Sequence, residues 1–225
     1  MMKIKAEELT RTFRVGSSEI VAVDRVSFEI SEPKFIAIVG RSGSGKSTLL
    51  NLIGLNDRPT SGRILVDDAD ATLFSSNRRR KTRLLQMGFV FQTFNLFPTL
   101  SALENVELPL SLAGKPRELQ REKAKTLLKA IGLGKRLQHR PKQLSMGEMQ
   151  RVAVARAMAN NPEIMIADEP TGELDSGTAQ EIITLLHNVN KRDRKTVIVA
   201  THDEKIIDVA DTVYMIQDGR MKLES

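Results

Sequence analysis

The sequence of 225 residues contains no cysteine and no tryptophan, a single tyrosine and only three histidines. Without cysteine, disulfide bridges and catalysis by a thiolate are excluded. The three histidines, His139, His187 and His202, do not have the spacing of a zinc site. With so few tyrosine and tryptophan side chains, an aromatic platform for single-stranded nucleic acid is not expected. Disulfide, thiolate, zinc and base-stacking chemistry are therefore set aside.

Long apolar runs are missing as well. No segment approaches the ~18–20 apolar residues that are needed to cross a bilayer, and the first residues, "MMKIKAEELTRTF", lack the apolar stretch of a secretory signal. Hydrophobic residues make up 40% of the chain and charged residues 28%, which is typical of a soluble globular protein. We expect a cytoplasmic protein whose length is enough for one substantial core with a sub-domain.

Basic residues outnumber acidic ones, 34 to 28, so that the net charge is +6 at pH 7. Such a chain tolerates nucleotides, nucleic acid or anionic headgroups as partners. The densest basic cluster is "NRRRKTR", residues 77–83. Its simplest interpretation is a solvated helix face, and a patch next to an anionic membrane or to nucleic acid is the alternative.

Three short apolar runs predict the strands of a parallel sheet. They are "FIAIVG" (35–40), "IMIADE" (164–169) and "TVIVATH" (196–202), and none of them alternates between apolar and polar residues. Such runs are typical of strands that are covered on both faces. Each ends in glycine or a polar residue, at the edge where open α/β sheets bind ligands. Helical patterns lie between the runs, so the predicted fold class is α/β.

The rest of the chain predicts two further parts. "VAVDRVSFEI" (21–30) alternates as a half-exposed antiparallel strand does, and "GRILVDD" (62–68) is a second candidate, so we expect a small antiparallel sheet that flanks the parallel one. From about residue 93 to 156 helical signals dominate, which predicts an inserted helical sub-domain. The expected organisation is a single two-lobed domain over residues 1–225, with its core formed by about 1–92 and 157–225 and the helical sub-domain by about 93–156.

The segment "GRSGSGKST" directly follows the first parallel strand and precedes the apolar helical stretch "LLNLIGL". Strand, glycine-rich loop and helix stand in the order of a phosphate-binding P-loop. Backbone N–H groups of the loop and the positive end of the helix are expected to bind the phosphates of ATP. Lys46 is expected to reach the β- and γ-phosphates, and Ser47 to ligate Mg²⁺. The predicted ATP-binding residues of the loop are Gly40, Arg41, Ser42, Gly43, Ser44, Gly45, Lys46, Ser47 and Thr48.

The other two parallel strands end in residues that complete such a site. Asp168 fits a carboxylate that holds Mg²⁺ through water. Glu169 follows it and would project toward the γ-phosphate, where a carboxylate can act as general base on the attacking water. His202 ends the third strand, and because all three strands should end at one edge, we expect it to contact the γ-phosphate. The alternatives are a solvated acidic pair and a surface histidine.

Six segments in order resemble the nucleotide-binding subunit of ABC transporters, and the likeness covers nearly the whole chain. "GRSGSGKST" is similar to the Walker A loop, "FVFQTFNL" to the Q-loop, "LSMGE" to the signature motif, "IMIADEP" to Walker B, "GELD" to the D-loop, and His202 to the switch histidine. The resemblance implies the P-loop NTPase fold of ABC ATPases and Mg²⁺-dependent ATP hydrolysis with Glu169 as the catalytic glutamate. It also implies that Gln92 touches Mg²⁺ and reports the nucleotide state, that Phe13 stacks on adenine, and that Asp175 belongs to the dimer contact.

A narrower likeness links "FVFQTFNLFPTLSALENVELPL" and "ADEPTGELD" to the branch of LolD, MacB and FtsE-type ATPases. That branch includes lipoprotein-release, macrolide-export and cell-division systems. Four positions depart from the family pattern, and one of them is "SEPKF" (31–35), where the family usually has a glycine turn before Walker A and Pro33 can make the turn. Phe13 stands where tyrosine is more usual, Glu173 where asparagine is more usual, and Met146 where the signature has a glycine.

Methionine is compatible with the backbone expected in the signature motif. Ser145, followed three residues later by Glu148 and an apolar helix, predicts a capping box. Met146 and Gly147 would be the first two helical residues, and helical φ and ψ suit any L-residue. Gly147 is expected to leave room for a ligand to approach. We therefore expect Ser145, Met146, Gly147 and Glu148 to form a working signature motif.

The resemblance implies that two chains pair head to tail as a homodimer and trap ATP between Lys46 of one and Ser145 of the other. It also implies a separate transmembrane permease and a position at the inner face of the cell membrane. An alternative is an FtsE-like ATPase that tethers or signals to a membrane partner without transporting solute. A soluble ABC ATPase acting on DNA or the ribosome is disfavoured, because this is one short domain without heptads, so nucleic acid is not expected as a partner.

Overall fold

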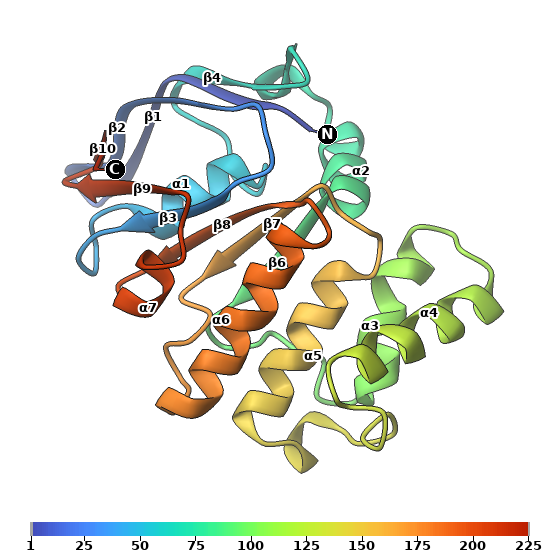
Figure 1. Cartoon of the computed structure of the whole chain (residues 1–225). Helices are drawn as coiled ribbons and strands as arrows, with labels where there is room; N and C mark the ends of the chain where they lie inside the picture. Colours follow the sequence, from blue (N-terminus) through green and yellow to red (C-terminus); the bar gives the residue numbers. More distant parts are fainter. Residues whose placement is uncertain (1, 225) are drawn as a thin grey trace.

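The structure is a computed structural model, and it describes residues 2–224. Figure 1 shows two sheets lying one above the other, with most of the helices on the side of the larger sheet away from the smaller one. None of the helices in this range combines the length and the apolar character needed to span a bilayer. The elements in chain order are β1 (Ile4–Val15), β2 (Ser18–Ile30), β3 (Phe35–Val39), α1 (Lys46–Ile53), β4 (Ser61–Val66), β5 (Ala69–Asp70), η1 (Ala71–Leu73), α2 (Ser76–Gln86), β6 (Met87–Phe91), α3 (Ala102–Leu112), α4 (Arg117–Ala130), η2 (Pro141–Gln143), α5 (Met146–Met158), β7 (Ile164–Asp168), α6 (Ser176–Lys191), β8 (Thr196–Thr201), α7 (Glu204–Ile207), β9 (Thr212–Gln217) and β10 (Arg220–Leu223).

The larger sheet has six strands in the order β10-β9-β3-β8-β7-β6. β3, β7 and β8 are the three strands predicted from apolar runs; they lie side by side and run parallel. β6 and β9 extend the parallel part of the sheet and were not predicted as parallel strands. The α/β prediction is confirmed, and the polar ends of β3, β7 and β8 meet at one edge, as expected for parallel neighbours.

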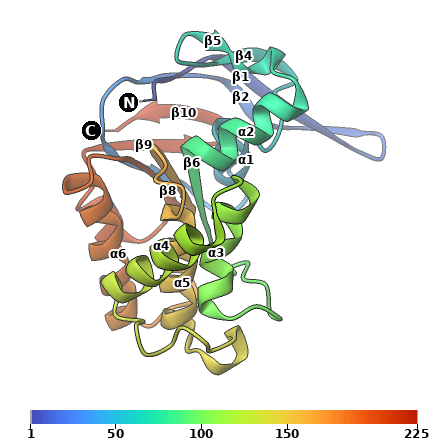
Figure 2. The same cartoon turned by 90° about the vertical axis from the view of Figure 1, so that its right-hand side faces the viewer.

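The smaller sheet is antiparallel, with the order β2-β1-β4-β5, and it contains both segments predicted to be antiparallel strands. β1 and β2 form a long hairpin whose tip projects well beyond the rest of the fold, in blue at the right of Figure 2. The pairing shifts register between Arg11 and Thr12, which pair with Val23 and Val21 and leave Ala22 as a bulge. A bulge increases local twist and re-aims the backbone.

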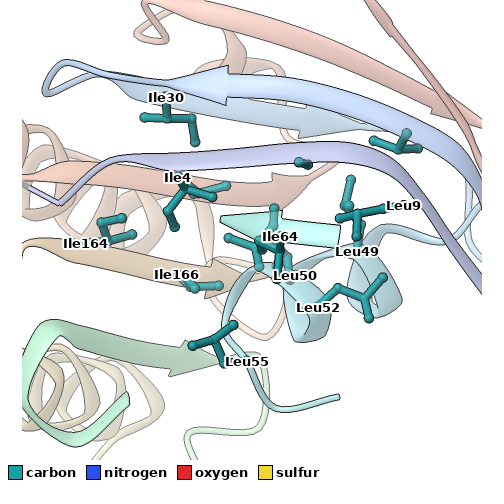
Figure 3. Close-up of a cluster of buried hydrophobic side chains, with 14 of the residues drawn as sticks. Ile4, Leu9, Ile30, Leu49, Leu50, Leu52, Leu55, Ile64, Ile164 and Ile166 are labelled. Atoms are coloured by element: carbon teal, nitrogen blue, oxygen red, sulfur yellow. The ribbon is translucent and has the colours of Figure 1, made fainter. Parts of the chain in front are cut away.

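The main core lies between the two sheets. Side chains from β1, β2 and β4 meet those of α1 and of β7, as the labelled residues of Figure 3 show. Leu49 and Leu52 of α1 are almost completely buried, and each such side chain contributes about 1.5–3 kcal/mol relative to an exposed one. This packing fixes α1, and therefore the loop that precedes it. A second core, on the opposite face of the larger sheet, packs α6 against β7 and β8.

Three helices, α3, α4 and α5, stand between β6 and β7 in the chain and share a core of their own. They occupy the lower right of Figure 1. α4 buries Ala124 and Leu128, which are four residues apart and therefore on one face. The predicted helical insertion is present, and its last helix continues to Met158 because α5 also packs beside β6.

The basic cluster on α2 is only partly the solvated face that its sequence favours. Arg79 is buried, with 6% of its surface exposed. Its guanidinium donates to the carbonyl oxygen of Leu55 at 2.7 Å and to that of Asp57, just beyond the end of α1. Arg83 donates to the same oxygen of Leu55 at 2.8 Å. Two of the cluster's cations therefore hold α2 on α1, and Arg79, the buried one, is not presented to a partner.

Candidate functional site

The glycine-rich loop leaves β3 at the carboxyl edge of the larger sheet. β3 is fully buried between β8 and β9, so the loop starts from a fixed position. Gly45 has a φ of 108°, and a Cβ there would lie 2.1 Å from the carbonyl oxygen of Ala22. Glycine alone tolerates both the left-handed backbone and this close approach. The bulge in β2 and the glycine at position 45 together bring the hairpin against the loop.

Lys46 begins α1 and is buried, with 8% of its surface exposed. Its ammonium group donates to the carbonyl oxygens of Gly40 at 2.7 Å and Arg41 at 3.2 Å. It also lies 3.6 Å from Oε1 of Glu169. The side chain thus turns back over its own loop, next to the positive end of α1. An ammonium group and a helix N-terminus at one place form a binding site for an anion such as phosphate.

Asp168 is the last residue of β7, and its Oδ1 is buried without a hydrogen-bond partner among the described residues. Burial raises the pKa of the Asp168 carboxyl, and a hydrogen bond with Ser47 opposes that shift. An unpaired buried carboxylate oxygen is costly unless a cation neutralises it. Carboxylate and hydroxyl oxygens beside a phosphate site are the ligands that Mg²⁺ takes. The residues present therefore fit the predicted metal.

Glu169 follows β7 with a φ of 44°, a left-handed conformation that is uncommon outside glycine. Its backbone N–H donates to the carbonyl oxygen of Ala200 on β8 at 2.9 Å, which holds this conformation in place. Its Oε1 lies 3.1 Å from Nδ1 of His202. Residues held in unusual backbone conformations are common at active sites. The structure thus brings Glu169, His202 and Lys46 together at one point.

These residues surround a pocket of about 660 Å³, within the range of small-molecule sites. Among the loop residues predicted to bind ATP, Ser44 alone does not line it; Ser44 is buried beneath the loop, with its hydroxyl unpaired. Phe13 is absent from the lining. The pocket is lined by Ala22, Gly40, Arg41, Ser42, Gly43, Gly45, Lys46, Ser47, Thr48, Gln92, Asp168, Glu169 and His202.

Gln92 follows β6 and reaches the pocket from the side of the helical sub-domain. Its Nε2 donates to Oε1 of Glu173 at 3.0 Å. Glu173 is the residue that departs from the usual asparagine of the D-loop, and its carboxylate therefore has a partner within the same chain. The contact joins the predicted Q-loop to the predicted D-loop, 81 residues apart, and no sequence spacing indicated it.

The predicted capping box at the start of α5 is present in full. Ser145 Oγ accepts from the backbone N–H of Glu148 at 3.2 Å, and Glu148 Oε2 accepts from the backbone N–H of Ser145 at 2.9 Å. Met146 is the first helical residue and is 52% exposed. None of the four signature residues lines the pocket of its own chain.

Gly147 does not leave room for a ligand, contrary to the expectation from the sequence. It is buried, and a Cβ there would lie 2.2 Å from Cγ2 of Thr178 on α6. The space is filled by the chain itself. Asp175 has a local structural role as well: it is the N-cap of α6 and accepts from the backbone N–H groups of Gly177 and Thr178, both at 3.0 Å.

Two further residues of the site were not found from the sequence. Ala22 reaches the pocket only because of the bulge in β2, which no sequence pattern indicated. Gln150 of α5 is completely buried, and its Nε2 donates to the carbonyl oxygen of Pro170 at 2.6 Å. This bond ties the helix of the signature motif to the segment that follows Glu169.

Comparisons with known proteins show the family of this chain. Residues 23–172 match the family model described as ABC transporter. An ABC transporter ATP-binding protein of Thermotoga maritima is 44% identical over 215 residues, which are 96% of this chain and 92% of that protein. The macrolide export ATP-binding/permease protein MacB of Syntrophobacter fumaroxidans is 42% identical over 99% of this chain, which spans only 31% of MacB.

The fold is similar to solved ATP-binding cassettes. The ABC transporter ATP-binding protein MJ0796 of Methanocaldococcus jannaschii is 44% identical over 98% of this chain and 96% of that protein. Its dimeric structure in a post-hydrolysis state, bound to ADP and Pi, matches with a TM-score of 0.89 over 98% of both chains. By family match, by identity over nearly its full length and by fold, this chain belongs to the ATP-binding ATPases of the ABC transporter family.

Proposed function

We propose that this chain hydrolyses ATP in a head-to-tail homodimer and thereby powers a separate transmembrane permease. The observation that carries the proposal is the divided site. One side holds the phosphate loop and both carboxylates in a pocket, while Ser145 and Met146 stand exposed at a capped helix start that does not reach that pocket. A second chain supplies the missing side. The dimeric structure of MJ0796 with ADP and Pi supports this arrangement.

Within one protomer the proposed roles follow from position. Lys46 exchanges its contacts with Gly40 and Arg41 for phosphate oxygens, which gain an ammonium partner. Ser47, Asp168 and Gln92 would hold Mg²⁺, which would supply positive charge beside the phosphates.

Glu169 is placed to act as general base. Its carboxylate lies between the ammonium group of Lys46 and the ring of His202, at the mouth of the phosphate loop. From there it takes a proton from a water that attacks the γ-phosphate. His202, whose side chain is 76% exposed, contacts the γ-phosphate on the same side and orients Glu169. The Ser145 hydroxyl and the N-terminus of α5 of the partner would close the site.

The experiment is a Glu169→Gln variant, which keeps the size of the side chain and removes the base. We expect it to bind MgATP, to lose hydrolysis and to accumulate as a dimer, because the ATP that links two chains is no longer consumed. Light scattering with and without MgATP measures the dimer, and the same variant with Lys46→Ala is the control that should stay monomeric. A Glu169→Gln protein that remains monomeric in saturating MgATP would contradict the shared site.

The permease is proposed to dock in a groove of about 380 Å³ between α2, α3 and α5. Phe97 and Leu112 line it and are 50% and 61% exposed, so an apolar partner surface would bury them. All charged side chains in its lining are arginines, Arg80, Arg83 and Arg156. This favours an apolar segment that carries a carboxylate.

MacB, whose name joins ATP-binding and permease activities, supports a membrane partner for this chain. Assaying solute movement in vesicles that contain the permease separates transport from the FtsE-like alternative.

A further inference from the structure

Phe13 does not stand alone on the hairpin. The guanidinium carbon of Arg11 lies over its ring, 4.6 Å from the ring centre. Arg11 in turn forms an ion pair with Asp57, with Nε 2.8 Å from Oδ2, although without hydrogen-bond alignment. Asp57 is fixed in the turn after α1, where its backbone N–H donates to the carbonyl oxygen of Asn51 at 3.1 Å. The three side chains form a chain of contacts from the end of α1 to the hairpin.

The hairpin reaches the nucleotide pocket a short distance away. Ala22, the bulged residue of β2, lines the pocket and lies against Gly45. Ile20, two residues before Ala22 on β2, pairs with Phe13. Two residues of strand span about 7 Å. Phe13, 38% exposed, therefore stands just beyond the rim of the phosphate loop, and the family resemblance implies that the base of ATP stacks on it there.

We propose that Arg11 is a positioning residue for the nucleotide base. Its guanidinium covers one face of the Phe13 ring, so that adenine stacks on the other face. The inference rests on the proposed function, in which ATP occupies the loop. Phenylalanine lacks the hydroxyl by which a tyrosine could be held in place. In place of such a hydroxyl, the Arg11 guanidinium over the ring, which Asp57 anchors, sets the orientation of the ring before the nucleotide binds.

Two physical effects act in the same direction. A ring already held in its binding orientation loses less conformational freedom when the base stacks on it. A cation on one face also draws π-electron density away from the other, which favours stacking by an electron-rich purine. A cation–π contact at a partly exposed site corresponds to about a twofold to fivefold change in affinity. The effect belongs to the base and not to the phosphates.

The test is a double-mutant cycle between Arg11→Met and Phe13→Ala. Methionine keeps the apolar stem of the arginine and removes its charge. The measured quantity is the Kd of a non-hydrolysable MgATP analogue, with Mg-tripolyphosphate as a ligand that has no base. Arg14→Met is the matched control. It removes the same charge from the same strand, and no hydrogen bond or ion pair of the Arg14 side chain is found among residues 2–224.

We expect Arg11→Met to raise the Kd of the ATP analogue about twofold to fivefold and to leave that of tripolyphosphate unchanged. In the Phe13→Ala background the same change should have no further effect. Asp57→Asn, which keeps the cation but weakens its anchor, should shift the Kd in the same direction by less. Arg14→Met should not distinguish the two ligands.

Three results would overturn the assignment. In the first, Arg11→Met still weakens binding of the ATP analogue in the Phe13→Ala background. In the second, Arg11→Met changes the Kd of both ligands equally. In the third, Arg11→Met tightens binding of the ATP analogue, which would show that the guanidinium occupies the ring face that adenine needs. A wild-type protein that binds neither ligand would instead contradict the proposed function itself, so the two failures are distinct.

Discussion

Met146 and Gly147 are neighbours in the sequence, yet the start of α5 gives them opposite surroundings. Met146 points to solvent and is 52% exposed, whereas Gly147 is buried against Thr178 of α6. The capping box explains why both are tolerated, since it satisfies the helix start through Ser145 and Glu148 whatever the residue between them. Methionine is therefore accommodated at the first position, and the glycine that this packing demands is the second.

We predict that Gly147→Ala destabilises the protein by about 1–3 kcal/mol, because its methyl group would meet Cγ2 of Thr178 at 2.2 Å. Met146→Gly, by contrast, should change hydrolysis severalfold at most. Urea denaturation measures the first effect and steady-state ATP hydrolysis the second.

A second substitution tests the cause of this effect. Thr178→Ser removes Cγ2 but keeps the hydroxyl that donates to Asp175 at 2.6 Å, so it should restore most of the stability lost in Gly147→Ala. A double variant as unstable as Gly147→Ala would show that the clash lies elsewhere.

If wild type were inert and Met146→Gly created activity, the methionine would be a defect after all.

At the scale of elements, α2 is held on α1 by a buried cation. Arg79 donates to carbonyl oxygens of Leu55 and Asp57, and burial lowers the pKa of its guanidinium. We predict that Arg79→Met lowers the free energy of unfolding by about 1–3 kcal/mol, because it leaves the carbonyl oxygen of Asp57 without this donor. Arg80→Met is the control. Among the described residues, the side chain of Arg80 bonds only that of Asn77, and its loss should cost less than about 0.5 kcal/mol. Equal losses in urea denaturation would refute a special role for Arg79.

The two capped helices predict a dependence of stability on pH. Backbone N–H groups of Ser101 and Ser145 hold the pKa values of Glu104 and Glu148 below the usual glutamate range. A carboxyl whose pKa is lower in the folded state stabilises that state above its unfolded pKa, about 4.3, and loses this contribution as pH falls through the lowered value. Glu104→Gln with Glu148→Gln should therefore flatten the fall in stability between about pH 5 and 3, measured by urea midpoints. Glu118→Gln, outside any capping box, should leave the slope unchanged.

At the scale of the whole molecule, the groove between α2, α3 and α5 is the surface proposed to bind the permease. Leu112 lines it and is 61% exposed. We predict that Leu112→Asp reduces co-purification with the membrane subunit at least about tenfold, because a buried apolar contact is replaced by a charge without a partner. Leu73→Asp is the control, since Leu73 is 81% exposed and lies outside the groove. An equal loss for both variants, or for neither, would place the permease elsewhere.

Features that depend on neighbours in the chain were predictable from the sequence. The order of strand, loop and helix around Lys46, the ends of β7 and β8, and the capping box of Ser145 follow from local rules of backbone geometry and hydrogen bonding. The edge strand β6 was missed. The burial of Arg79 was missed as well, because a run of arginines has the composition of a solvated face whatever lies against it.

By itself the sequence determined that this chain has a phosphate loop, two carboxylates and a histidine at the ends of buried parallel strands, and that its signature helix tolerates methionine. Only the tertiary structure decided which groups meet: Gln92 with Glu173, Gly147 with Thr178, Arg11 with Phe13 and Asp57. The reason is physical. Propensity, capping and periodicity act within a few residues, whereas these contacts join segments that approach each other only when the sheets and helices pack.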